Sequence, residues 1–250
     1  MVRAEIGAVA KQGYARAPIV EAVFDVRFSE VLSERDMERL KDRLKSRYPT
    51  VEDRKNIKIE VKADKVITTS NPAGYKMTAS NAVDVILIQT NDLGSARLAP
   101  YQTWEDFIGV ARENYEVFTK VVGRKTLTRV ATRFVNRFDI PTEEIEGHDV
   151  AEWISTSIAL PEGLTKAIGP YSFAVNFIHQ NTGTKVLIQS GIIAPALLKH
   201  VSINLDIDVS VDTDISAHKD EIVKIAPRLR EAKNSVFESL ITDKLRAKFR

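Results

Sequence analysis

Apolar and polar residues alternate along three stretches of the chain, at residues 20–28, 128–140 and 201–211. A period of two residues is typical of a β-strand with one buried face. Each stretch therefore predicts a strand that lays one face on a core. The apolar face of the first stretch holds Val20, Ala22, Phe24, Val26 and Phe28, and that of the last holds Val201, Ile203, Leu205, Ile207, Val209 and Val211.

Other segments have the spacing of amphipathic helices. The first predicted helix begins after Ser33, whose side chain can cap it together with Asp36, and its apolar stripe is Met37, Leu40, Leu44 and Tyr48. A second helix is expected from Trp104, with Thr103 at its N-terminus. A short helix is expected over residues 150–158. A long helix is expected over residues 218–249, in which Pro227 marks a kink or a new start.

Runs of β-branched residues between turn residues predict an antiparallel meander. The segments in order are 57–70, a turn at "NPAG" (71–74), 75–80 and 83–90, then a turn at "NDLG" (91–94). A hairpin is expected over 171–193, with "QNTG" as its turn. Strands grouped between helices favour an α+β fold over a doubly wound sheet.

We therefore expect an α+β chain of two lobes, each a largely antiparallel meander sheet flanked by helices. The acidic stretch after Pro141 suggests a boundary, so the lobes are residues 1–143 and 144–250, packed as one compact unit. Length permits this, because 250 residues can bury a sizeable core.

Composition excludes several kinds of chemistry. The chain has no cysteine, so it has no disulfide, thiolate nucleophile or cysteine-ligated zinc. It also has no glycine-rich phosphate loop and no Gly-x-Ser-x-Gly elbow, and its four histidines are scattered. We therefore expect no cofactor and no metal site. The longest apolar run, from Gly191, is too short to span a bilayer, so a cytoplasmic protein without a membrane partner is expected.

Charge gathers on the polar faces of two predicted strands. Arg129, Arg133 and Arg137 share one face, and successive members lie about 13 Å apart, too far to converge on one small anion. They could follow a polyanion, but carboxylates of the opening strand, Glu21 and Asp25, are the more favoured partners, since cross-strand charge pairs are common. With Arg27, these residues form the candidate binding site.

Asp206 and Asp208 lie on one face of the last long strand, about 7 Å apart. That spacing is too wide for a single metal without further ligands. The favoured interpretation is a solvated face that protects a sheet edge.

Three segments, "PIVEAVFDVRF" (18–28), "TRFVNRFDIP" (132–141) and "VFESLITDKLRAKF" (236–249), together resemble a sporadically distributed bacterial family of unknown function. Their order implies a match over the whole chain. The resemblance implies no reaction or catalytic residue, and a patchy distribution is typical of mobile or defence-associated genes.

The absence of a catalytic constellation and a net charge of +2 favour a binding or interaction protein over an enzyme. Its expected partners are another protein or a second copy, with nucleic acid or an anionic ligand also open. The alternative is a phosphate-ester or nucleic-acid-processing enzyme that uses the arginine row with Asp206 and Asp208.

Overall fold

The computed structural model describes residues 14–62, 65–145, 150–156, 171–213, 215 and 221–249. Within them, nine strands form one sheet in the order β2-β3-β4-β5-β1-β6-β9-β8-β7, and every neighbouring pair is antiparallel. The strands are β1 (Ile19–Phe28), β2 (Thr50–Lys62), β3 (Lys65–Thr78), β4 (Asp84–Gln89), β5 (Asp92–Leu98), β6 (Leu127–Pro141), β7 (Ser172–Ile178), β8 (Lys185–Ile193) and β9 (His200–Val211).

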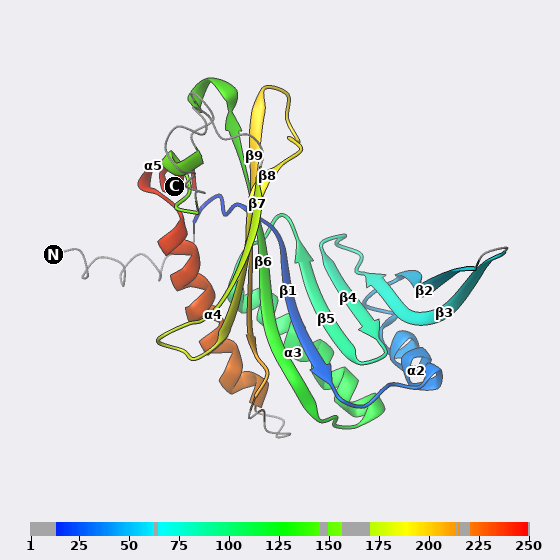
Figure 1. Ribbon diagram of the computed structural model, residues 1–250. Helices are drawn as coiled ribbons and strands as arrows, with labels where there is room; N and C mark the ends of the chain where they lie inside the picture. The colour runs from blue at the N-terminus through cyan, green and yellow to red at the C-terminus, as the bar shows by residue number, and fades with distance from the viewer. Residues whose placement is uncertain are drawn as a thin grey trace.

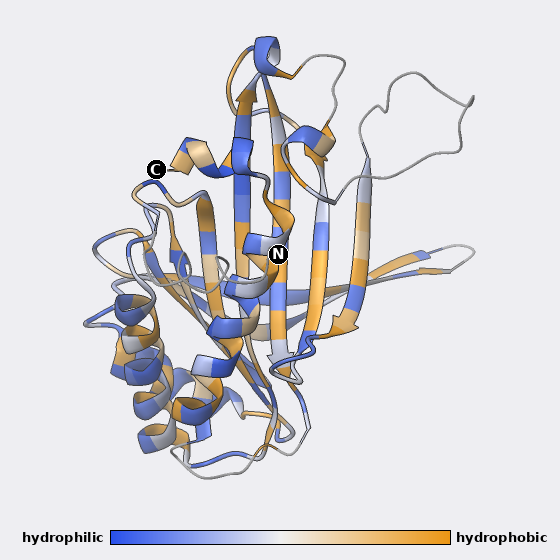
Figure 2. Cartoon of the chain, turned by 90° about the vertical axis from the view of Figure 1, so that its left-hand side faces the viewer, coloured by the Kyte–Doolittle hydropathy of each residue, from blue (hydrophilic) through white to orange (hydrophobic). Residues whose placement is uncertain are grey.

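The long helices cover one face of this sheet (Figure 1). Helix α4 lies along β6 and β9, α3 crosses behind β1 and β5, and α2 lies near β3 and β4. The central strands β1, β6 and β9 face the helices with alternate residues, and Figure 2 shows the bands of hydrophobic and hydrophilic residues along the strands. The helical elements are α2 (Glu34–Leu44), α3 (Trp104–Val122), α4 (Glu221–Leu240) and α5 (Asp243–Arg246), with 3₁₀ turns at Thr142–Glu144, Val150–Glu152 and Ala247–Phe249.

Two apolar cores lie between the helices and the sheet. The larger core packs α4 and the start of α3 on β1, β6, β8 and β9, around Phe24, Phe134 and Leu229. The smaller core packs α2 and the end of α3 on β3, β4 and β5, around Leu40 and Phe118. Helix α3 therefore joins the two cores.

The antiparallel α+β architecture confirms the fold class expected from the sequence. The alternation at 20–28, 128–140 and 201–211 corresponds to β1, β6 and β9 within one residue at each end. The predicted caps are also confirmed, since the side chains of Ser33 and Thr103 accept hydrogen bonds from the backbone N–H groups of Asp36 and Asp106.

The turn predicted at "NPAG" is wrong. β3 runs through residues 71–74, and the sheet accommodates them with a bulge opposite Arg54 and Lys55. Gly74 has φ of 127°, and an added Cβ would lie 1.9 Å from the carbonyl oxygen of Ile88. Pro72 is tolerated because proline is compatible with bulges. β2 and β3 consequently form a long hairpin that projects from the rest of the sheet (Figure 1).

The helix predicted over 150–158 is also wrong in its described part. Val150–Glu152 forms only a 3₁₀ turn, and Ile154 then makes a β-bridge with Ile241. Both Trp153 and Ile154 are fully buried, so tertiary packing overrides the helical spacing. Residues 157 and 158 lie outside the described part of the chain.

Strands from both predicted lobes join in a single sheet, because β6 pairs with β1 on one side and β9 on the other. The division at 143/144 stays a prediction about folding units. Among the described residues, no helix has both the length and the apolarity needed to cross a bilayer.

Candidate functional site

The charged residues predicted as a site gather in the middle of the sheet, on the face turned away from the helices. We call this surface the charged face. It consists of Glu21, Asp25 and Arg27 on β1, Asp92 on β5, Arg129, Arg133, Arg137 and Asp139 on β6, and Asp206 and Asp208 on β9.

Arg129 is the centre of the charged face. Its guanidinium donates to both carboxylate oxygens of Asp25, at 2.6 and 2.8 Å, and to Asp208 at 2.5 Å. The expectation that β1 and β6 share a sheet and exchange a salt bridge is therefore confirmed. Only 17% of the Arg129 side chain is exposed, so its charge depends on these two carboxylates rather than on water.

The other arginines are also paired. Arg133 holds Asp206 with Nε and Nη2, at 2.9 and 2.5 Å, and Arg27 donates to Asp92 at 3.2 Å. Arg137 pairs with Asp139 on its own strand, at 3.1 Å, and not with Glu21 or Asp25. Within the described residues Glu21 forms no ion pair, although its charge acts on Arg133.

The solvated edge expected for Asp206 and Asp208 is wrong. β9 lies inside the sheet, between β6 and β8, and the side chain of Asp206 is only 6% exposed. Burial raises the pKa of Asp208, against the opposing effect of Arg129. Both carboxylates serve as counter-charges to arginines, because a buried charge is stable only when it is paired.

Each arginine of the charged face therefore has a carboxylate partner on the same face. No group of His, Asp and Glu among the described residues is arranged to hold a metal ion. That the six predicted residues bind a ligand stays a prediction. The guanidinium groups of the four arginines among them already pair with carboxylates.

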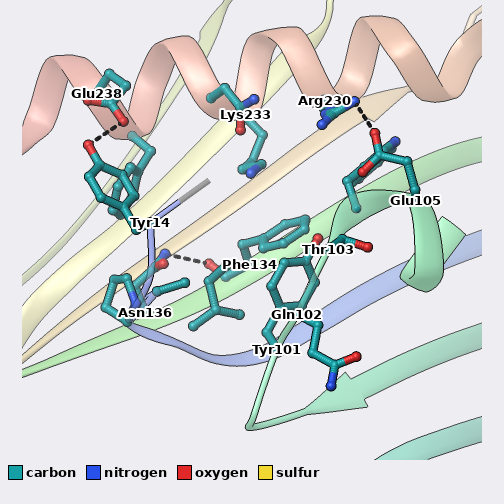
Figure 3. A pocket seen from close by; sticks show the side chains of 16 residues that line it. Tyr14, Tyr101, Gln102, Thr103, Glu105, Phe134, Asn136, Arg230, Lys233 and Glu238 are labelled. Carbon is teal, nitrogen blue, oxygen red and sulfur yellow. Dashed lines mark hydrogen bonds and ion pairs between the residues drawn. The ribbon is translucent and has the colours of Figure 1, made fainter. Parts of the chain in front are cut away.

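A second site lies on the opposite side of the sheet, where sequence analysis expected none. A cavity of about 300 Å³ opens between α4, the start of α3, β6 and the segment that leads into β1 (Figure 3). Its lining residues are Tyr14, Ala17, Pro18, Ile19, Tyr101, Gln102, Thr103, Trp104, Glu105, Phe134, Asn136, Arg230, Lys233, Asn234, Phe237 and Glu238.

Aromatic rings form the wall of the cavity on the sheet side. The Phe134 ring is surrounded by Tyr101, edge-on at 5.5 Å between centroids, and by Trp104, stacked at 6.3 Å. Burial raises the pKa of the Tyr101 hydroxyl well above its ordinary value. The cavity can therefore accept a flat, apolar group against these rings.

The carboxylates at the cavity already have donors. Glu238 accepts from the Tyr14 hydroxyl at 2.7 Å and from Arg246 at 3.2 Å. Glu105 accepts from Arg230 at 2.7 Å. Burial raises the pKa of Tyr14 to about 12, and its hydrogen bond to Glu238 acts in the same direction. The negative charges of the cavity are thus compensated.

Lys233 is the exception. Its side chain points from α4 into the cavity (Figure 3), and its amine lies 4.2 Å from the centroid of the Phe134 ring. Within the described part of the chain it has no ion pair and no side-chain hydrogen bond. Burial and the neighbouring charge of Arg230, opposed by the charge of Glu238, lower the pKa of Lys233 to about 7.

A sequence signal for Lys233 exists in the pattern of α4. The buried residues Ala226, Leu229, Val236 and Phe237 form a stripe on which Lys233 occupies an apolar position, four residues after Leu229. A lysine in such a stripe either extends its amine to the surface or enters the interior. The sequence alone does not distinguish these two outcomes.

The three segments that carry the family resemblance meet at this cavity. The first contributes Pro18 and Ile19, the second Phe134 and Asn136, and the third Phe237 and Glu238. Segments far apart in the chain thus build one site.

Comparisons with known proteins assign no family. No protein-family model and no curated protein matches the chain. A solved structure described as DynU16, a protein in the dynemicin biosynthetic locus, is similar over 88% of this chain and 98% of its own, at 7% identity. Its TM-score is 0.23, which is too low to support an argument about fold or function.

Proposed function

We propose that this protein binds a small organic molecule in the cavity between α4 and the sheet. The observation that carries the proposal is Lys233, a lysine with no described counter-charge that points into a cavity walled by aromatic rings. Lys233 is partly buried, and a partly buried amine without an ion pair is unfavourable for folding, so its presence is best explained by a ligand. Concave apolar cavities with a few polar groups are the usual form of small-molecule sites.

The geometry describes the ligand in outline. A planar or apolar part would lie against Phe134, Tyr101 and Trp104, and a polar group would meet the amine of Lys233. A volume of about 300 Å³ limits the ligand to a compact molecule.

The alternative enzyme hypothesis would use the charged face. No specific observation favours it, because Arg129 and Arg133 are already held by Asp25, Asp208 and Asp206. An anionic substrate would have to displace these carboxylates.

Ligand binding can be tested by ¹H–¹⁵N NMR titration with benzyl alcohol and benzoate. We expect chemical-shift changes confined to α4, the start of α3 and residues 134–136. Lys233→Met should change the affinity for benzoate more than that for benzyl alcohol, and Lys224→Met, at an exposed position on the same helix, should change neither.

Binding of an anionic probe on the charged face, instead of an aromatic probe in the cavity, would contradict the proposal. The proposal fails if neither aromatic probe binds while AMP or a single-stranded oligonucleotide does, with binding lost in Arg133→Ala.

We further propose, from the resemblance and the cysteine-free composition, a cytoplasmic bacterial protein that acts with a protein partner or a second copy, in a mobile or defence-associated system. Purification of the tagged chain from its native host, followed by size measurement, tests this: a monomer that co-purifies with nothing would contradict it.

A further inference from the structure

The chemistry available to Lys233 depends on what surrounds its amine. On α4 it has Arg230 one turn before it and Glu238 five residues after it. Glu105 of α3, Tyr101 of the segment before α3 and Tyr14 line the same cavity. Glu238 and Glu105 are engaged by Arg246, Tyr14 and Arg230. The ring of Phe134 lies directly beneath the amine.

These surroundings disfavour the ammonium form and favour the free amine. Burial and the nearby charge of Arg230 favour the free amine, and they outweigh the opposing charge of Glu238. The face of the Phe134 ring attracts the ammonium form and holds the side chain in the cavity. Lysines become nucleophiles in such places, where they are desolvated or lie next to another cation. The amine then has an unshared electron pair at neutral pH.

We propose that Lys233 captures the carbonyl group of an aldehyde or ketone ligand as a reversible Schiff base. This inference rests on the proposed function and adds the chemical class of the ligand. The Lys233 nitrogen attacks the carbonyl carbon with its electron pair, and the carbonyl π electrons move to oxygen. Two protons from the amine leave with that oxygen as water, and a carbon–nitrogen double bond remains. No oxidant, metal or cofactor is needed.

The cavity provides for both parts of such a ligand. Tyr101, Trp104 and Phe134 would hold the group attached to the carbonyl, and they would keep bulk water from reversing the condensation quickly. The Tyr14 hydroxyl, which donates its proton to Glu238, lies on the same cavity, and its oxygen could accept a hydrogen bond from the carbinolamine hydroxyl before water leaves.

The experiment is reductive trapping on the full chain. The protein is incubated at pH 7 with benzaldehyde and sodium cyanoborohydride, which converts the imine into a stable secondary amine, and the modified lysines are located by peptide mass spectrometry. Lys224, which is 70% exposed on the same helix, is the internal reference. We expect trapping at Lys233 to exceed that at Lys224 by at least about tenfold, because Lys233 lies on the cavity that would hold the aldehyde ring and Lys224 does not.

Benzyl alcohol completes the test, since it has the same ring but no carbonyl group. It should protect Lys233 from trapping and leave Lys224 unchanged. Equal labelling of the two lysines would overturn the proposal. If benzyl alcohol or benzoate binds in the cavity but benzaldehyde is not trapped at Lys233, the Schiff base is refuted while the binding function stands. If none of the three probes enters the cavity, both fail.

Lys233→Met and Lys233→Arg provide a second measurement. Both should abolish the adduct at position 233, whereas Lys224→Met should leave that adduct unchanged. An adduct of equal yield on another cavity-side amine in these variants would contradict a specific role for Lys233.

Discussion

The charged face and the cavity lie on opposite sides of the same sheet, and they treat charge in opposite ways. On the charged face Arg129, Arg133 and Arg27 each meet carboxylates within 3.2 Å. In the cavity the carboxylates are compensated, and Lys233 lies over an aromatic ring. A conspicuous row of charges can therefore be structural, whereas a single charge without a counter-charge indicates a site.

Arg129→Met should have the largest effect on stability among the variants of the two regions. It removes the charge and keeps much of the side-chain volume. We expect a loss of about 3 kcal/mol in the free energy of unfolding, because the largely covered Asp208 would lose its arginine and Asp25 would keep only the longer contact with Arg27, at 3.7 Å. Urea denaturation at pH 7 measures it. Adding Asp25→Asn and Asp208→Asn should recover much of the loss, and a loss below about 1 kcal/mol in the single variant would mean that Arg129 is not structural.

Lys233→Met should stabilise the protein, whereas Arg129→Met should destabilise it. At pH 6 we expect the variant to be more stable than the wild type by about 1–3 kcal/mol, because burying the ammonium is unfavourable. The pKa of Lys233 is about 7 in the folded protein and about 10.4 in the unfolded chain.

The unfolded chain therefore holds the extra proton between these values. Wild-type stability should rise with pH from about 7 to about 10, and the advantage of the variant should shrink over the same range. Thermal denaturation from pH 6 to pH 10 measures both; a constant difference would show that the amine is not responsible.

Asp92→Asn tests the carboxylate of the charged face whose ionised form is disfavoured by burial and by the charge of Asp25. Burial and the charge of Asp25 raise the pKa of Asp92 to about 6. The folded protein thus holds the proton more tightly than the unfolded chain, so wild-type stability falls as pH rises from about 4 to about 6.

We expect Asp92→Asn to stabilise the protein by about 1–2 kcal/mol at pH 7, with no difference below about pH 4. Urea denaturation at several pH values is the measurement. Destabilisation at pH 7 would instead show that the Arg27 pair outweighs burial.

Arg137→Met gives the smallest effect. Its side chain is 37% exposed, and its partner Asp139 lies two residues away on the same strand. We expect a change below about 1 kcal/mol. This variant is the matched control for Arg129→Met, and an equal loss in the two would remove the distinction between buried and exposed pairs.

Much of the fold could be predicted, because β1, β6 and β9 each pack one face on the core and so show a clean alternation. The pairing of Asp25 with Arg129 followed from the same alternation. The pairing of Arg137 with Asp139 did not follow from it, because the two residues lie on the same face of one strand and their contact depends on side-chain rotamers.

Other features depend on contacts between distant segments. The central position of β9, which buries Asp206, is fixed by its pairing with both β6 and β8. The extended path of β3 through Pro72 depends on a bulge that local turn preferences do not reveal. Lys233 follows the helical pattern of α4. That its amine lacks an ion pair becomes clear only when Glu105 and Glu238 are seen to pair with Arg230 and Arg246.

Among the described residues the amine of Lys233 has no ion-pair partner, and an NMR titration of that amine measures the consequence. Lysine side chains labelled with ¹³C at Cε are followed from pH 5 to pH 11, and Lys233→Met identifies the Lys233 signal. We expect that signal to titrate with a pKa of about 7, well below the ordinary value of a lysine. A Lys233 pKa at or above that ordinary value would show that the amine is solvated or paired, and would contradict the account of the cavity.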